Sequence, residues 1–186
     1  MPFPEAAALP LTAITAWELL FDRLGVAQGG GQSDAILVTG AAGGVGAILV
    51  QLARALTGLT VFGTASRPET RAWVARLGAH HVLDHGQPLA AQVAALGLGA
   101  PAFVFSTTNT DQHLGQIAEL IAPQGRFALI DDPERLDVGP FKRKSVSTHW
   151  EFMFTRSLFA TPDLAAQGAL LTEVAGLVDA GVLRTT

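Results

Sequence analysis

The chain has 186 residues and carries 12 lysines and arginines against 16 aspartates and glutamates, a formal net charge of −4. Hydrophobic residues make up 49% of the sequence and charged residues only 15%, which excludes a disordered chain because disorder needs low hydrophobicity. The acidic balance argues against a nucleic-acid partner, and no apolar run predicts a membrane span. Cysteine and tyrosine are absent, which excludes disulfides and thiolate metal sites. Without a signal-peptide pattern at its start, the protein is expected to be cytoplasmic.

The first half of the chain indicates one helix followed by alternating strands and helices. Leucines and isoleucines near helical spacing predict a helix over residues 6–24, and the glycines at 29–31 break the chain after it. Short apolar runs then predict strands buried on both faces. The expected strands lie at 35–39, 60–64 and 82–83, and the expected helices at 45–57, from 66 or 68 to 77, and at 88–97.

The second half continues the alternation. Strands are expected at 102–105, 126–130 and 145–147, and helices at 111–121 and 163–180, with Gly181 as the stop of the last helix. Parallel strands need a crossover helix for each connection. The pattern therefore predicts an α/β fold, a Rossmann-type doubly wound parallel sheet of about six strands with helices on both faces.

The strongest chemical feature is a turn with four glycines in seven residues, Gly40 to Gly46, between the first strand and its helix. We call it the glycine turn. Gly43 would let a pyrophosphate approach the backbone, Gly46 would let the helix pack closely, and the helix N-terminus would offer N–H groups to phosphates. Ala41 replaces the first glycine of a G-x-G-x-x-G pattern, so a tight turn without a ligand is the alternative. No Lys-Ser or Lys-Thr follows, which excludes a P-loop.

The end of the second expected strand bears on the choice of coenzyme. An acidic residue about 20 positions after the turn would bind the ribose 2′-hydroxyl of NAD, but Ala65 stands there. Ser66 and Arg67 follow, and a hydroxyl and a guanidinium suit a 2′-phosphate. The sequence therefore favours NADPH over NADH. Alternatively, or in addition, Ser66 caps the next helix, with Pro68 and Glu69 in its first turn.

Several motifs together resemble a known superfamily. Short-chain dehydrogenases share a similar turn, but they rely on a Tyr-x-x-x-Lys pair and this chain has no tyrosine. The sequence instead resembles the nucleotide-binding domain of medium-chain dehydrogenase/reductases, in particular the quinone-oxidoreductase branch and its zinc-type alcohol dehydrogenase-like proteins. The matching stretches are residues 5–12, 15–17, 40–46, 65–68, 77–79, 82, 84–85 and 123–125.

The resemblance implies a division of the chain. Residues 1–30 would be an interdomain helix and linker, and residues 31–186 the dinucleotide-binding domain. Family members also carry an N-terminal GroES-like catalytic domain and a C-terminal return segment, which we expect to lie outside this sequence. The implied partners are that catalytic domain and a small-molecule acceptor, and a homodimer stays open. The aromatic stretch 149–154 lies near the cleft and subunit interface in relatives, although Phe152 and Phe154 could instead pin the last helix to the sheet.

The resemblance also implies NADPH as the cofactor and ten residues as its contacts, all at the carboxyl ends of strands or beside them. These are Thr12 and Val45 at the nicotinamide, Gly43, Gly44 and Gly46 at the pyrophosphate, Ser66 and Arg67 at the 2′-phosphate, Thr107 and Thr108 near the nicotinamide ribose, and Ile130 near the carboxamide. Ordinary core packing is the alternative for Val45 and Ile130, and contact with the catalytic domain is the alternative for Thr12.

The implied activity is hydride transfer from NADPH to an enone, quinone or carbonyl acceptor in the parent protein, with this chain alone not catalytically competent. Zinc is not expected in this chain, because His81 and His85 flank a predicted strand and do not share a helix face. A non-catalytic NADPH-binding or oligomerisation module is the alternative function. A methyltransferase is disfavoured, because it would normally have an acidic residue where Ala65 stands.

Overall fold

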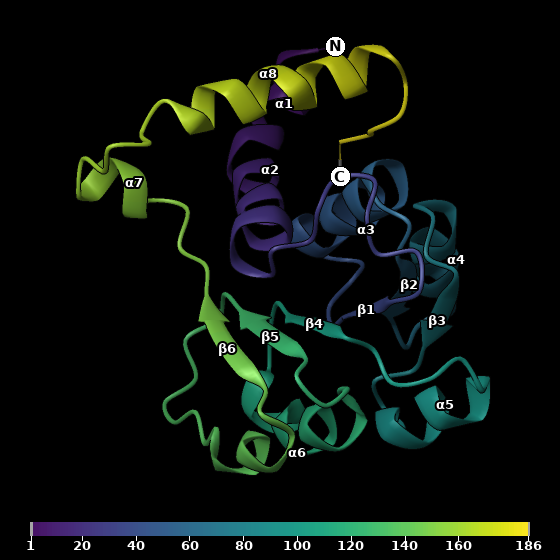
Figure 1. The fold of residues 1–186 in the computed structure, drawn as a ribbon. Coiled ribbons are helices and arrows are strands. Elements are labelled where there is room, and N and C mark those ends of the chain that lie inside the picture. Colours follow the sequence, from purple (N-terminus) through teal and green to yellow (C-terminus); the bar gives the residue numbers. More distant parts are fainter. Residues whose placement is uncertain (1, 186) are drawn as a thin grey trace.

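A computed structural model describes residues 2–185 and contains one sheet of parallel strands in the order β3-β2-β1-β4-β5-β6 (Figure 1). The strands are β1 (Ala35–Val38), β2 (Thr60–Thr64), β3 (His81–Leu83), β4 (Phe103–Ser106), β5 (Arg126–Leu129) and β6 (Ser147–Trp150). The strand order reverses between β1 and β4. Open α/β sheets bind ligands beyond the carboxyl ends of the strands at such a reversal.

Helices cover both faces of the sheet. They are α1 (Phe3–Ala7), α2 (Leu9–Trp17), the π-helix η1 (Glu18–Arg23), α3 (Gly44–Leu56), α4 (Pro68–Arg76), α5 (Leu89–Leu96), α6 (Thr110–Leu120), the 3₁₀-helix η2 (Gly139–Lys144), α7 (Thr155–Leu158) and α8 (Ala166–Asp179). Apolar residues of α2, α3, α4 and α8 share one core cluster, and those of α5 and α6 share the other (Figure 1). The doubly wound Rossmann-type fold is thus confirmed.

Strand β1 shows why a continuous apolar run was the right signal for a central strand. Ile36 and Val38 belong to the core layer under α2 and α3, whereas Ala35 and Leu37 belong to the layer over α5 and α6. Alternate side chains of a strand point to opposite faces, and helices cover both faces here. Every residue of the strand is therefore buried, and no polar alternation is left in the sequence.

The long N-terminal helix expected over residues 6–24 is divided into three elements. Pro10 lies in the first turn of α2, where its missing N–H costs nothing. After Trp17 the backbone widens into the π-helix η1, in which the Leu24 N–H donates to the Leu19 carbonyl at 2.8 Å. Helical spacing of apolar residues cannot distinguish such a widening from a regular α-helix, so the sequence did not reveal it.

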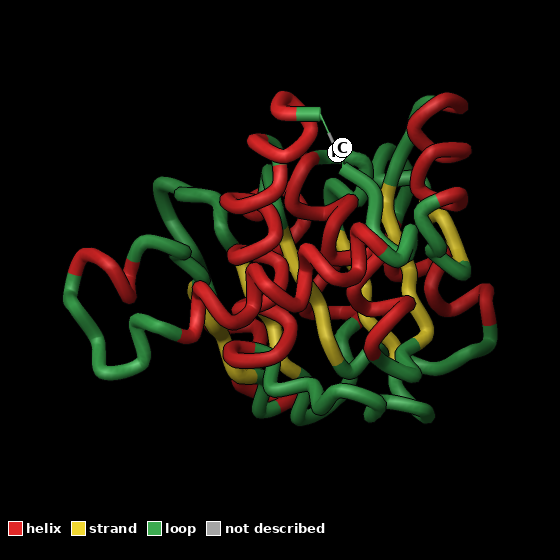
Figure 2. Tube along the Cα trace, turned by 90° about the horizontal axis from the view of Figure 1, so that it is seen from above, coloured by secondary structure: helices red, strands yellow, loops and turns green. Residues whose placement is uncertain are grey.

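The C-terminal third departs most from expectation. The sixth strand was placed at 145–147, but Ser145 has a φ of +53° at the end of η2, and a left-handed residue cannot begin a strand. The strand β6 therefore starts at Ser147. The helices η2 and α7 were not expected, and α7 lies on an excursion beside the body of the domain (Figures 1 and 2). Gly181 does follow the last helix in the left-handed conformation, with a φ of +69°.

Within residues 2–185, no helix combines the length and the apolar character that crossing a bilayer would require.

Candidate nucleotide-binding site

Two glycines of the glycine turn are required by the fold itself. Gly40 has a φ of +64°, and a Cβ there would overlap the Thr107 hydroxyl oxygen. A Cβ on Gly46 would overlap the Gly40 carbonyl and lie 2.9 Å from the Cα of Ala41. The left-handed backbone at Gly40 and the backbone overlap at Gly46 therefore require glycine at both positions, whether or not a ligand binds. The tight-turn interpretation is therefore correct for these two positions.

Gly43 and Gly44 have a different reason to lack side chains. Gly43 has a φ of −78°, and the nearest atom to an added Cβ is the Gly40 carbonyl oxygen at 3.3 Å. An added Cβ on Gly44 would lie 3.2 Å from the Thr12 methyl group. Both glycines are exposed, so their bare backbone faces open space. A side chain at either position would occupy that space. Backbone without side chains, facing open space, is the arrangement expected where a ligand approaches closely.

The first turn of α3 offers hydrogen-bond donors at this point. The N–H groups of Gly44, Val45 and Gly46 precede the first internal bond of the helix, from Ala47 to the Gly43 carbonyl at 2.8 Å. No side chain caps this helix. Free N–H groups and the positive end of a helix dipole attract anions. The residues present therefore fit a pyrophosphate.

A cavity of about 380 Å³ lies in front of the turn, at the strand-order reversal. Its lining includes most of the residues expected to contact the coenzyme: Gly43, Gly44, Val45, Gly46, Thr107, Thr108 and Ile130, together with Gly40. Val45 and Ile130 are half-buried against the core as well as lining the cavity. At these two positions the side chain therefore packs against the core and also borders the cavity.

A second cavity, of about 240 Å³, lies on the other side of the turn. It shares Gly40 and Gly43 with the first cavity and extends past Ala65 to Ser66 and Arg67. The buried Ala65 side chain offers no carboxylate, and Ser66 and Arg67 are exposed. The two cavities are therefore neighbours at the carboxyl ends of the strands, with Gly40 and Gly43 lining both.

Ser66 is not the cap of α4, and that expectation was wrong. The N-cap position is Arg67, with extended backbone at φ −82° and ψ 144°, and no side chain caps the helix. Pro68 fixes the start of the helix one residue later than a Ser66 cap would require. The Ser66 hydroxyl is thus not engaged as a helix cap.

His85 also lines the second cavity, a placement that the sequence analysis missed. The sequence patterns point to this histidine as a possible metal ligand and as part of a matching stretch, but not as a residue of the coenzyme site. It follows β3, the neighbour of β2, so the rule that ligands bind at carboxyl ends of strands could have found it. Its ring lies edge-on to that of His113, with centroids 6.3 Å apart. Burial and then the nearby His85 lower the pKa of His113.

A buried polar network connects the strand ends next to the glycine turn, and the sequence did not predict it. The Thr39 hydroxyl lies 3.1 Å from the Ser106 hydroxyl, which also receives a hydrogen bond from Thr110 at 2.7 Å. The Thr107 hydroxyl donates to the Thr39 carbonyl at 2.9 Å, and Asp131 accepts from the Thr110 N–H at 3.0 Å. These bonds join the ends of β1, β4 and β5. They fix the wall on which Thr107 stands.

Thr12 comes to this site from outside the strand–helix units. It lies on α2, and its hydroxyl donates to the carbonyls of Ala8 at 3.0 Å and Leu9 at 3.1 Å. Its methyl group is the part that faces Gly44. The structure thus places Thr12 beside the glycine turn, and its contact with the nicotinamide stays a prediction.

The residues present do not fit a zinc ion. Across residues 2–185, no group of three or more histidine, cysteine, aspartate or glutamate side chains could hold a metal. His81 lies within β3, and His85 lies beyond the end of that strand. No chemical step of this chain is therefore assigned to a metal.

Comparison with known proteins places the chain in a family. The family model described as zinc-binding dehydrogenase matches residues 44–162. Zinc-type alcohol dehydrogenase-like proteins of Staphylococcus aureus, such as that of strain MSSA476, are 36% identical over 98% of the chain, which covers 55% of their length. The chain thus spans about half the length of the curated relatives that it matches.

Solved structures of similar proteins match nearly the whole chain. A protein from Rhizobium etli CFN 42, described as a zinc-dependent alcohol dehydrogenase, is 63% identical with a TM-score of 0.94 over 100% of this chain and 55% of that one. A quinone oxidoreductase of Pseudomonas syringae is 27% identical, with a TM-score of 0.82 over 99% of this chain and 56% of that one. A mycobacterial protein solved with NADPH is 26% identical, with a TM-score of 0.80 over 98% of this chain and 55% of that one.

The family match, the curated relatives and the solved structures agree with the resemblance seen in the sequence. The chain belongs to the zinc-binding dehydrogenase family, as the nucleotide-binding half of a medium-chain dehydrogenase/reductase.

Proposed function

We propose that the chain binds NADPH along the carboxyl edge of its sheet and forms the coenzyme half of an oxidoreductase. The observation that carries this proposal is the pair of cavities that meet at Gly40 and Gly43. One cavity is lined by the donors of the first turn of α3, and the other by Ser66 and Arg67. A dinucleotide has its pyrophosphate in the middle and a nucleoside on either side, which matches this order.

The pyrophosphate would lie on Gly43 and Gly44, where no side chain blocks the backbone. Its oxygens would accept hydrogen bonds from the N–H groups of the first turn of α3, which a phosphate can reach from outside the helix. The adenosine half would then extend into the cavity lined by Ser66 and Arg67. The nicotinamide half would extend into the cavity lined by Thr107, Thr108 and Ile130.

The preference for NADPH rests on Ala65 and Arg67, two residues that follow β2. Ala65 offers no carboxylate to accept from a ribose 2′-hydroxyl, whereas Arg67 offers a guanidinium that can bind a phosphate through charge-assisted hydrogen bonds. Arg71 holds this loop in place by donating to the Ala65 carbonyl at 3.2 Å and the Val82 carbonyl at 2.9 Å. The loop is thus braced before a ligand arrives, which lowers the entropy cost of binding.

When bound, the nicotinamide supplies a hydride from C4 for reduction of an enone, quinone or carbonyl acceptor. The part of this chain is to orient the ring and to exclude water from one side of it. Val45 and Ile130 provide apolar walls, and the bond from Thr107 to the Thr39 carbonyl fixes the third wall. The other half of the acceptor site would come from the part of the relatives' length that this chain does not span, so we expect no turnover by this chain alone.

Calorimetric titration of the chain with NADPH and, separately, NADH tests the proposal. We expect NADPH to bind more tightly. Arg67→Ala should weaken NADPH binding by about ten- to hundredfold, the worth of a hydrogen bond to a charged group, and change NADH binding by less than about twofold. Arg143→Ala removes another exposed arginine, outside both cavities, and should leave both affinities unchanged. Equal loss of both coenzymes in Arg67→Ala would contradict the assigned 2′-phosphate contact.

A further inference from the structure

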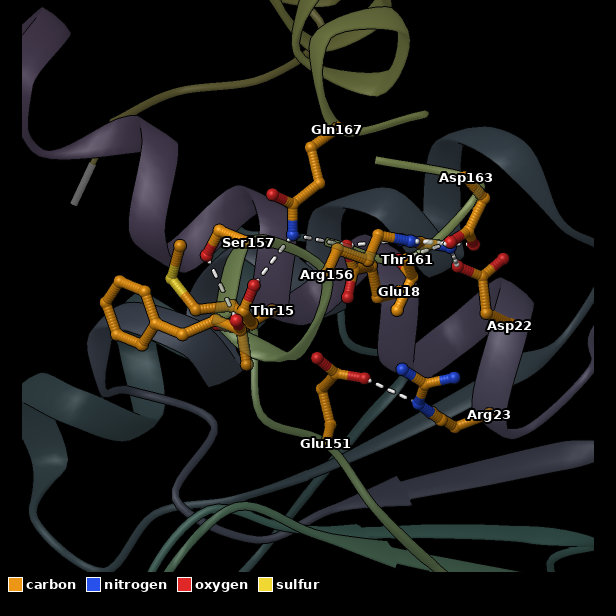
Figure 3. A network of polar contacts seen from close by, with 12 residues as sticks. Thr15, Glu18, Asp22, Arg23, Glu151, Arg156, Ser157, Thr161, Asp163 and Gln167 are labelled. Atoms are coloured by element: carbon orange, nitrogen blue, oxygen red, sulfur yellow. Dashed lines mark hydrogen bonds and ion pairs between the residues drawn. The ribbon is translucent and has the colours of Figure 1, made fainter. Parts of the chain in front are cut away.

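A cluster of charged side chains lies away from both cavities, between η1 and the segment that follows β6 (Figure 3). We call residues 151–167 the strap, because they lead from β6 across η1 to the start of α8. The carboxylate cluster consists of Glu18, Asp22 and Arg23 on η1 and of Glu151, Arg156 and Asp163 on the strap. Four carboxyl groups thus face two guanidinium groups.

Arg156 is the centre of the cluster. Its Nε donates to Asp163 at 2.9 Å, its Nη2 donates to Asp22 at 2.9 Å, and its Nη1 donates to Glu18. Burial disfavours the charged form of Arg156, but its hydrogen bonds to Asp22, Asp163 and Glu18 outweigh this effect and raise its pKa. One guanidinium therefore serves three carboxylates. Glu151 depends on another cation, because Arg23 Nε donates to it at 2.8 Å.

Glu18 and Glu151 each keep one oxygen without a partner. Both side chains are 0% exposed, and within residues 2–185 Glu18 Oε2 and Glu151 Oε1 have no hydrogen-bond donor. The two carboxyl groups belong to the same buried cluster, because Arg23, which lies on η1 with Glu18, donates to Glu151 (Figure 3). Ionised carboxylates only accept hydrogen bonds, so two of them cannot bond to each other. A single proton between them would partner both orphaned oxygens and remove the like-charge repulsion.

The environment favours that proton on Glu151. Burial is the largest cause that raises the pKa of Glu151; Arg23 opposes it, Glu18 adds to it, and the net result is a pKa of about 7. The other charged groups here are Asp22 on η1, and Arg156 and Asp163 on the strap. On the sheet, Arg126 and His149 face Arg23. Burial and then these two arginines lower the pKa of His149.

Few apolar contacts hold the strap to the body. Phe152 is 54% exposed, Leu158 67% and Phe159 75%, so these side chains contribute little buried area. The polar contacts join the strap to η1, and Gln167 adds hydrogen bonds to Glu18 at 2.8 Å and to the Met153 carbonyl at 2.7 Å. Attachment of the strap therefore depends on how the charges of this cluster are balanced.

We propose that Glu18 and Glu151 share one proton in the folded protein, and that this pair acts as a pH-sensitive latch that holds the strap against η1. The sign follows from linkage. In the unfolded chain Glu151 ionises near its ordinary pKa of 4.5, whereas in the folded protein it keeps its proton to about pH 7. The stabilising contribution is thus present below pH 4.5 and is lost as the pH rises to about 7.

Glu151→Gln tests the latch, because the amide keeps an oxygen for Arg23 and supplies a permanent donor to Glu18. At pH 8 we expect the melting temperature to exceed that of the unchanged chain by about 3–8 °C, and the difference should shrink by pH 5.5. Amide hydrogen exchange in the strap, corrected for intrinsic rates, should slow in the variant at pH 8. Glu134→Gln, which changes an exposed glutamate, should alter neither quantity.

A lower melting temperature for Glu151→Gln at pH 8 would overturn the proposal, because it would mean that an ionised Glu151 paired with Arg23 is the stabilising form. Infrared difference spectra of the unchanged chain between pH 6 and pH 8 give a second readout that needs no variant. A protonated-carboxyl band that disappears with a midpoint near pH 7 supports the shared proton. The absence of that band at pH 6 would overturn it.

Discussion

The glycine turn and the carboxylate cluster differ in the polar groups that they present: the turn exposes backbone N–H groups, whereas the cluster buries charged side chains. At the turn, four of the seven residues are glycines, and the N–H groups of the first turn of α3 stay open to a ligand. In the cluster, the carboxyl groups of Glu18 and Glu151 are buried, and each pairs with an arginine inside the protein. The fold at the glycine turn does not depend on a bound ligand. Loss of Arg156 from the cluster should destabilise the fold, because the buried Glu18 would then lack its cationic partner.

The two regions are joined by one continuous helical segment. Thr12 on α2 lies beside Gly44 of the turn, and six residues later Glu18 on η1 meets Arg156 and Gln167. The α-helix ends between these two contacts, at Trp17, and the π-helix begins with Glu18. π-helical turns often occur where a side chain must be placed for a particular task. Here the widened backbone carries the charged residues of η1 toward the strap.

Removal of Arg156 should have the largest effect on stability. Arg156→Ala leaves Glu18, which is 0% exposed, without its guanidinium partner. Breaking a buried ion pair in this way costs about 3–5 kcal/mol, whereas Asp22 and Asp163 are partly exposed and can turn to water. Urea unfolding at pH 7 measures the loss, with Arg143→Ala as the exposed-arginine control. A loss below about 1 kcal/mol would mean that Glu18 does not depend on Arg156.

Gly46→Ala should have the next largest effect. Its Cβ would overlap the Gly40 carbonyl, and overpacking of this kind costs about 1–3 kcal/mol. Gly115→Ala is a matched control within α6, because no atom lies within 4 Å of an added Cβ there. That change should stabilise the protein by about 0.5–1 kcal/mol, as expected for alanine in a helix. Equal free energies of unfolding for the two variants would contradict the close approach at Gly46.

The comparison also explains what could be predicted from sequence. The turn is local, and its glycines, the strand before it and the helix after it are neighbours in the chain. The structure has β2 at the predicted bounds, and α3 differs by one residue at each end. The resemblance assigned Thr107, Thr108 and Ile130 to the coenzyme site, and all three line the cavity that the turn borders. That these residues bind a coenzyme stays a prediction.

The carboxylate cluster could not be predicted by the same means. Arg23 and Glu151 are 128 positions apart in the chain, and Glu18 and Arg156 are 138 positions apart. A glutamate on a helix normally indicates a solvent-facing position, and only the strap reverses that expectation for Glu18. The strap in turn begins where β6 ends, which is at Trp150 and not at residue 147 as predicted. Long-range pairs of polar residues carry no periodic signal.

Gly43→Ala is the most discriminating test, because its expected effect on stability is the smallest and its expected effect on binding is large. The backbone at Gly43 is in a region open to any residue, and an added Cβ meets only the Gly40 carbonyl oxygen at 3.3 Å. The free energy of unfolding should therefore change by less than about 0.5 kcal/mol. The methyl group would occupy the space assigned to the pyrophosphate, so affinity for NADPH and NADH should fall together by about tenfold or more, the equivalent of 1.4 kcal/mol. Thermal unfolding and calorimetric titration of the same preparation separate the two quantities. Unchanged affinity for both coenzymes would show that the pyrophosphate does not lie on the glycine turn, whereas a joint loss with an unchanged fold would show that Gly43 is kept for the ligand and Gly46 for the fold.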